Sequence, residues 1–137
     1  MNTDDSLKRF GIVPPDEALN EIRGILASEA AAERAGKPRH EDLALLSCVQ
    51  LFSRGALEDV LRIWAAKRSG MDLGSYIDVQ LLCGAGLTET KAFLSSQPGS
   101  DAAAALSYIE RCEAAGDFVD FSPSAYLGQR KRYFCAD

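Results

Sequence analysis

Apolar residues recur at intervals of three and four along most of the chain, and this spacing restricts the possible folds more than any other feature. The clearest stripe consists of Leu57, Val60, Leu61, Trp64 and Ala65. Glu58, Asp59, Arg62 and Lys67 lie off this stripe, which is typical of an amphipathic α-helix with one buried face. No run of five or more residues alternates β-branched and polar side chains, so no strand is predicted. The sequence therefore predicts an all-α fold.

Breaker and capping residues divide this pattern into helices. Residues 1–13 lack the pattern and are expected to be loosely ordered. Two prolines followed by two carboxylates predict a first helix within 14–36, which would cap one end of the fold. Helical hairpins are expected over 40–135, and the helix after Ser122-Pro123 would cap the other end. A chain of 137 residues normally forms one domain, here antiparallel hairpins stacked as a short α-α superhelix or an orthogonal bundle.

One segment of the chain is echoed thirty residues later. VQLFSRGALEDVLRIW, residues 49–64, returns as VQLLCGAGLTETKAFL, residues 79–94, and each copy predicts an apolar helix, a glycine turn and an amphipathic helix. One such hairpin cannot bury its apolar face alone, whereas stacked hairpins can. In this respect residues 40–135 resemble α-helical repeat proteins of the tetratricopeptide or HEAT kind, without the tetratricopeptide tryptophan and proline signature. The block is also similar to small bacterial proteins without assigned activity. The alternative is that any buried hairpin favours such residues.

Composition excludes several classes of function. The formal net charge is −5, and an acidic surface repels phosphate backbones, so no nucleic-acid partner is expected. No segment approaches the roughly 20 apolar residues of a membrane span. The first ten residues lack the pattern of a targeting signal. We therefore expect a cytoplasmic protein that does not bind membranes. The charge suits a basic protein partner, although solubility alone favours the same charge.

The sequence contains no recognisable catalytic, metal or cofactor motif. His40 is the only histidine and lies beside two carboxylates. The glycine-rich CGAG, residues 83–86, lacks the preceding strand and following lysine of a phosphate-binding loop. The cysteines are too far apart for a zinc knuckle or a redox dithiol: they are Cys48, Cys83, Cys112 and Cys135. We expect no cofactor, no metal and no enzymatic activity. An enzyme that uses His40 or a cysteine is an alternative.

Two groups of polar residues are candidates for binding. Gln50 and Gln80 recur at matching places inside apolar helices, where an amide either bonds a backbone group or faces a ligand groove. Tyr76 and Asp78 precede the second copy and would share that groove. The second group is an acidic patch near a helix C-terminus, where negative charge is unfavourable: Glu110, Glu113, Asp117 and Asp120. Contact with a basic partner would explain this patch.

These features together predict a non-catalytic protein-binding domain. Its size, acidity and expected location are similar to those of bacterial immunity proteins, which neutralise a toxin by docking on it. The alternative is a structural subunit that self-associates into a homo-oligomer through an apolar helix face.

Overall fold

The computed structural model describes residues 1–135, which form eight α-helices and three short 3-10 helices and contain no strand. The all-α class is therefore confirmed. The α-helices are α1 (Thr3–Phe10), α2 (Leu19–Arg34), α3 (Leu43–Arg54), α4 (Val60–Lys67), α5 (Met71–Tyr76), α6 (Leu87–Ser96), α7 (Ser100–Ala114) and α8 (Pro123–Cys135). The 3-10 helices are η1 (Asp16–Ala18), η2 (Leu57–Asp59) and η3 (Val79–Leu82). Among residues 1–135, no helix combines the length and apolar character that a bilayer span requires.

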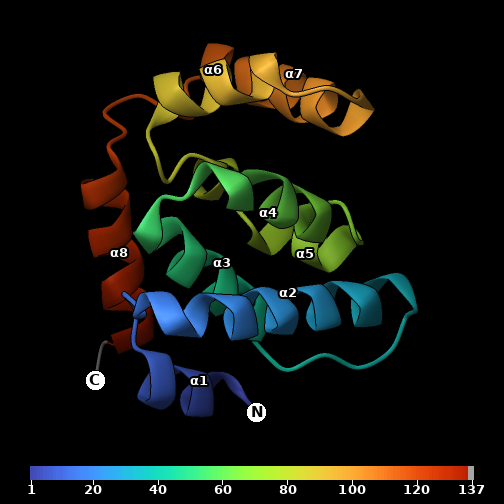
Figure 1. Cartoon of the computed structure of the whole chain (residues 1–137), viewed down its shortest axis with the longest axis vertical. Helices are drawn as coiled ribbons and strands as arrows, with labels where there is room; N and C mark the ends of the chain where they lie inside the picture. Colours follow the sequence, from blue (N-terminus) through green and yellow to red (C-terminus); the bar gives the residue numbers. More distant parts are fainter. Residues whose placement is uncertain (136–137) are drawn as a thin grey trace.

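The helices stack in layers along the long axis of the molecule (Figure 1). α1 lies at one end, α2 and α3 come next, α4 and α5 form the middle layer, and α6 and α7 cover the other end. α8 runs along one side of this stack and packs mainly on α3. The ends are thus formed by α1 and the α6–α7 pair, and not by residues 14–36 and the last helix as the sequence analysis expected.

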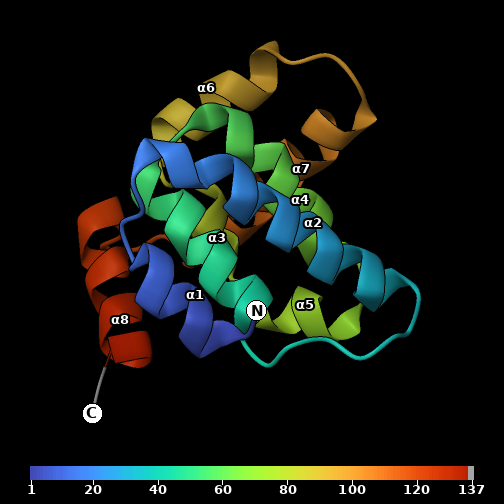
Figure 2. The ribbon, with the colours of Figure 1, turned by 60° about the horizontal axis from the view of Figure 1, so that its bottom comes forward.

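α3 is the central helix because it has almost no polar face. Every residue from Leu43 to Phe52 is buried. α3 contacts α1, α2, α5 and α8, and it lies between α2 and α8 when the molecule is seen from the α1 end (Figure 2). Inside this helix the Ser47 hydroxyl donates to the Leu43 carbonyl oxygen at 2.9 Å. Gly55 ends the helix at φ 65°, a conformation that favours glycine.

The predicted stripe of the second hairpin helix is largely buried. Four of its five members lie in the core or pack against it: Leu57, Val60, Leu61 and Trp64. Ala65 is exposed, because the buried face of α4 is centred on Ile63 and Ala66. The 3-4 spacing therefore identifies the helix and most of its buried side, with an error at one position.

The two copies of the echo do not fold alike. VQLF belongs to the 12-residue α3, whereas VQLL forms only the short η3. Ile77 and Asp78 are extended after α5, and Cys83 leaves the helical conformation before the turn at Gly84, so only the four residues of η3 between them are helical. The expectation of an apolar α-helix in the second copy is therefore wrong. The amphipathic halves agree better, because α4 and α6 are both α-helices.

The first residues of the chain form α1, where the sequence analysis expected loose order. Asn2 caps this helix, because its side chain accepts from the Asp5 backbone N–H at 2.9 Å and the Asp5 carboxylate accepts from the Asn2 N–H at 3.1 Å. Phe10 and Ile12 then enter the core. The signal that identifies this helix in the sequence is the Asn2–Asp5 spacing of a capping box.

Candidate functional site

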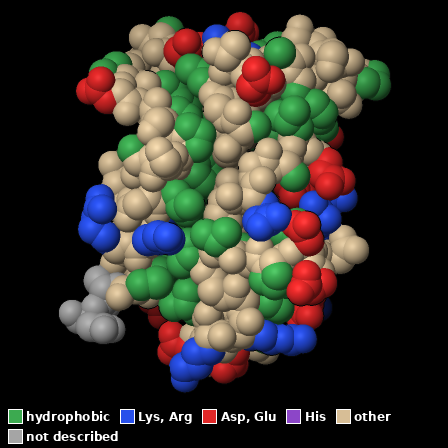
Figure 3. Space-filling model, turned by 60° about the vertical axis from the view of Figure 1, so that its left-hand side comes forward, with side chains coloured by type: hydrophobic (Ala, Val, Ile, Leu, Met, Phe, Trp, Pro, Cys, Tyr) green, Lys and Arg blue, Asp and Glu red, His purple; other side chains and the backbone are tan. Residues whose placement is uncertain are grey.

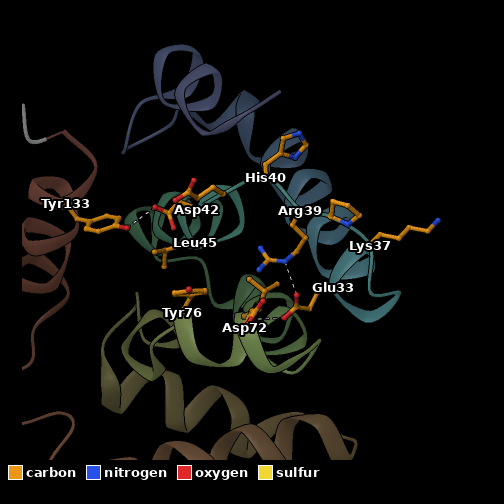
Figure 4. A pocket seen from close by; sticks show the side chains of 12 residues that line it. Glu33, Lys37, Arg39, His40, Asp42, Leu45, Asp72, Tyr76 and Tyr133 are labelled. Carbon is orange, nitrogen blue, oxygen red and sulfur yellow. Dashed lines mark hydrogen bonds and ion pairs between the residues drawn. The ribbon is translucent and has the colours of Figure 1, made fainter.

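The structure has a hollow of about 500 Å³, here called the tyrosine cleft, bounded by residues 33–45, α5 and Tyr133 of α8 (Figure 4). Tyr133, Tyr76 and Asp42 gather around Leu45 on one side, and Arg39 and Glu33 face each other on the other side. A second hollow of about 590 Å³ shares residues 40–42 and Tyr133 and extends to α1. The two hollows therefore adjoin each other at residues 40–42 and Tyr133.

Glu33 fixes the far wall of the tyrosine cleft. One of its carboxylate oxygens accepts from the Arg39 Nε at 2.9 Å, and the other accepts from the Leu73 backbone N–H at 2.9 Å. Both charged side chains are largely buried. The hydrogen bond from Leu73 and, less strongly, the Arg39 side chain lower the pKa of Glu33, against an opposing effect of burial. One carboxylate thus connects the end of α2, the 37–42 loop and the start of α5.

The lowered pKa of Glu33 predicts acid-sensitive stability. A carboxylate whose pKa is lowered in the folded protein stabilises it above the unfolded pKa, and this stabilisation is lost as the pH falls through the folded pKa. We therefore expect the difference in free energy of unfolding between wild type and Glu33→Gln to be largest near neutral pH. This difference should shrink as the pH falls below 4.5, the ordinary pKa of a glutamate side chain. Urea denaturation of both proteins from neutral pH into the acid range measures it. The exposed α6 carboxylate, changed by Glu89→Gln, serves as control, and a pH-independent difference for Glu33→Gln would contradict the assignment.

Asp42 and Tyr133 form the near wall. The Tyr133 hydroxyl donates to an Asp42 carboxylate oxygen at 2.8 Å, and this hydrogen bond raises the pKa of Tyr133. Asp42 has φ 61°, and within residues 1–135 only Asp120 is another non-glycine residue at positive φ. Aspartate tolerates this conformation better than most residues. Tyr76 and Tyr133 are 58% and 55% exposed, so much of both rings is free for contact.

His40, the only histidine of the sequence, lies on the rim of the cleft and contributes to its structure. Its backbone N–H donates to a Glu29 carboxylate oxygen at 3.0 Å, and its Nδ1 lies 3.2 Å from the other oxygen. Among residues 1–135, no three His, Cys, Asp or Glu side chains are grouped so as to hold a metal ion. All four cysteines are free. Burial raises the pKa of the Cys48 and Cys83 thiols, which disfavours the nucleophilic thiolate.

A smaller hollow of about 250 Å³, here called the η3–α8 groove, lies between the start of η3, residues 117–122 and α8. Asp78 accepts from the Tyr126 hydroxyl at 2.7 Å and forms an ion pair with Arg130. The Arg130 Nε also donates to the Tyr126 hydroxyl at 3.0 Å. The principal polar groups of this groove therefore fasten α8 to the stack, which leaves them less free to bind a ligand.

The structure brings some of the sequence-predicted residues together and separates others. Four of them line the η3–α8 groove: Asp78, Gln80, Asp117 and Asp120. Gln80 donates from its side-chain amide to the Asp117 carbonyl oxygen at 2.7 Å, so it bonds a backbone group. Tyr76 lies in the tyrosine cleft instead. The expected groove shared by all of the first group is therefore not present.

Gln50 and two members of the acidic patch lie in neither hollow. Gln50 is completely buried, and its side-chain amide donates to the Gly11 carbonyl oxygen at 2.9 Å and to the Ser6 hydroxyl at 3.3 Å. Gln50 therefore connects the end of α1 to α3, and the expectation that it faces a ligand groove is wrong. Glu113 pairs with Lys91 at 2.7 Å, whereas Glu110 is exposed on α7. The acidic patch is thus partly neutralised by α6.

Sequence reasoning missed most residues of the tyrosine cleft. Glu33, Arg39 and Asp42 appear in the sequence as ordinary charges near helix ends. Tyr133 lies 91 residues from its partner Asp42, and no local pattern connects positions so far apart. Of the lining residues, only Tyr76, as a binding residue, and His40, as the residue of an alternative enzyme, were candidates beforehand.

Comparison with protein-family models, curated proteins and solved structures gives no match to this chain. No role can therefore be transferred to the tyrosine cleft from a relative, and its function follows from its own contacts, exposure and charge.

Proposed function

We propose that this chain is a non-catalytic protein-binding module and that the tyrosine cleft is its docking site. The observation that carries this proposal is the pair of tyrosines, each more than half exposed, beside a cleft of about 500 Å³. Tyrosine is enriched in protein interfaces because its ring offers a large contact area with few rotatable bonds. An exposed pair of such rings around a concave surface fits this use.

The walls of the cleft support the same proposal because they are already ordered. Glu33 bonds Arg39 and the α5 backbone, and Tyr133 bonds Asp42. Glu29 holds the 37–42 loop through the His40 backbone. A surface that is preorganised in this way loses less conformational entropy when a partner binds.

An immunity-type inhibitor of a bacterial toxin is the specific form of this function that we favour. The net charge of −5 and the carboxylates of the cleft support a basic partner of this kind. Co-purification with the product of a toxin-like reading frame immediately upstream would support this form. Inhibition of that product by the purified chain would then be the decisive measurement.

Substitutions in the cleft test the binding proposal. A partner identified by crosslinking and mass spectrometry in the native host would be purified and titrated by calorimetry. We expect Tyr76→Ala and Tyr133→Ala each to weaken its binding by about 30-fold, the size of an interface hot spot. Val119→Ala, at an exposed position that lines the η3–α8 groove, is the matched control and should bind as wild type does. Normal binding by both tyrosine variants, with folding verified by circular dichroism, would reject the cleft as the docking site.

A self-associating subunit is the second candidate function. The face in Figure 3 carries an irregular band of hydrophobic side chains along the long axis, with charged side chains on both sides. Such a band supports association between copies. Light scattering over a range of concentrations tests it, and a monomer mass at every concentration would remove this candidate.

A further inference from the structure

We infer that the occupant of the tyrosine cleft is an arginine side chain from an extended basic segment of the partner protein. This inference rests on the proposed binding function and adds the chemistry that the partner must have. Two features carry it: the charge of the cleft lining and its exposed aromatic rings.

The lining of the cleft carries more negative than positive groups. Four carboxylates border it, from Glu33, Glu41, Asp42 and Asp72, against the two cations of Lys37 and Arg39. Arg39 is already paired with Glu33. The adjoining hollow adds the Asp4 carboxylate. An acidic or phosphorylated occupant would be repelled here, and an apolar one would remove water from carboxylates without replacing their hydrogen bonds.

The exposed tyrosine rings favour arginine over lysine as the cationic side chain that occupies the cleft. A guanidinium stacks on an aromatic face and donates two parallel hydrogen bonds to a carboxylate, whereas an ammonium does so less well. α8 already shows this pairing, because Arg130 lies 5.3 Å from the Tyr126 ring centre and 6.0 Å from that of Tyr133. The free surface of Tyr133 and the ring of Tyr76 can offer the same contact to an incoming arginine.

The negative charge of Asp42 can be removed by substitution without disturbing the fold. Its backbone has φ 61°, which asparagine tolerates as well as aspartate does. Asp42→Asn therefore keeps the shape of the cleft and an oxygen that can accept from Tyr133. Asp72→Asn removes a second charge, from the exposed Asp72 side chain on α5, and Glu89→Gln removes an exposed charge from α6 as a control.

The probe is a blocked peptide, acetyl-Gly-Arg-Gly-Arg-Gly-amide, titrated into the full chain and followed by nuclear magnetic resonance of the tyrosine rings. We expect it to shift the Tyr76 and Tyr133 signals. We also expect the peptide with citrulline, the neutral isostere of arginine, to bind about tenfold more weakly. Asp42→Asn and Asp72→Asn should each weaken the binding of the arginine peptide several-fold, and Glu89→Gln should leave this binding unchanged. Raising the salt concentration tenfold should also weaken binding.

Three results would overturn the inference. Equal binding of the citrulline and arginine peptides would show that the cleft does not recognise the positive charge of arginine. Equal binding of spermidine would show that the cleft takes any small cation and not a protein segment. Concentration-dependent self-association that Asp42→Asn abolishes would make a second copy of the chain the occupant. If the inference failed but Tyr76→Ala still weakened the native partner, the protein-binding proposal would stand with a partner of different chemistry.

Discussion

Replacing Asp59 with alanine is expected to lower the free energy of unfolding by about 3 kcal/mol, the cost of breaking a buried ion pair on one side. Asp59 is 1% exposed, and its two carboxylate oxygens accept from the Arg23 Nε at 2.7 Å and Nη2 at 3.0 Å. Arg62 donates to the same carboxylate at 3.0 Å. The Arg23 side chain is only 15% exposed, so its guanidinium would remain largely desolvated, with the Glu58 carboxylate and the Asn20 side-chain oxygen as its remaining partners. These remaining contacts place the effect at the lower end of the usual range for such pairs.

Glu58→Ala is the matched control for this prediction, because Glu58 bonds the same Arg23 at 3.1 Å but is mostly exposed. An exposed ion pair contributes about 1 kcal/mol at most, so the control should change stability little. Urea denaturation of the two variants and wild type gives the comparison. Equal losses in the two variants would show that the ion pair between α2 and η2 does not depend on burial for its strength.

The central layers of the fold can be predicted from the sequence because they are determined by residues that are close together along the chain. LALLSCVQLF has no polar face, and a helix of this kind has to lie in the middle of the molecule. Gly55 ends α3 as expected, and Ser122 caps α8 by accepting from the Ala125 N–H at 3.2 Å. These features depend on a few neighbouring residues whose preferences agree with the final structure.

The position of α8 and the tyrosine cleft could not be predicted because they depend on distant contacts. α8 lies along the side of the stack because Tyr126 and Arg130 reach Asp78, about fifty residues earlier. Tyr133 then arrives beside Asp42 as a consequence of that placement. Helical periodicity shows which side of α8 is apolar, but it does not show where along the stack the helix will lie.

Gly84→Ala is expected to lower the free energy of unfolding by about 3 kcal/mol, the upper part of the range for overpacking a well-packed core. A Cβ at this position would lie 2.6 Å from the Phe52 carbonyl oxygen and 3.1 Å from its Cα. These are backbone atoms at the end of α3, and the Phe52 ring is itself buried against Tyr126 at 5.3 Å. Neither the turn at Gly84 nor the end of α3 can therefore move away without a large cost in free energy.

Gly24→Ala is the control that separates this clash from a general effect of replacing glycine. Gly24 lies inside α2, and a Cβ there meets no atom within 4 Å, so we expect a gain of about 0.5–1 kcal/mol from better helix propensity. Opposite signs for the two variants in urea denaturation would establish that Gly84 is required for close backbone contact. A neutral Gly84→Ala would instead show that the turn after η3 can move away from α3.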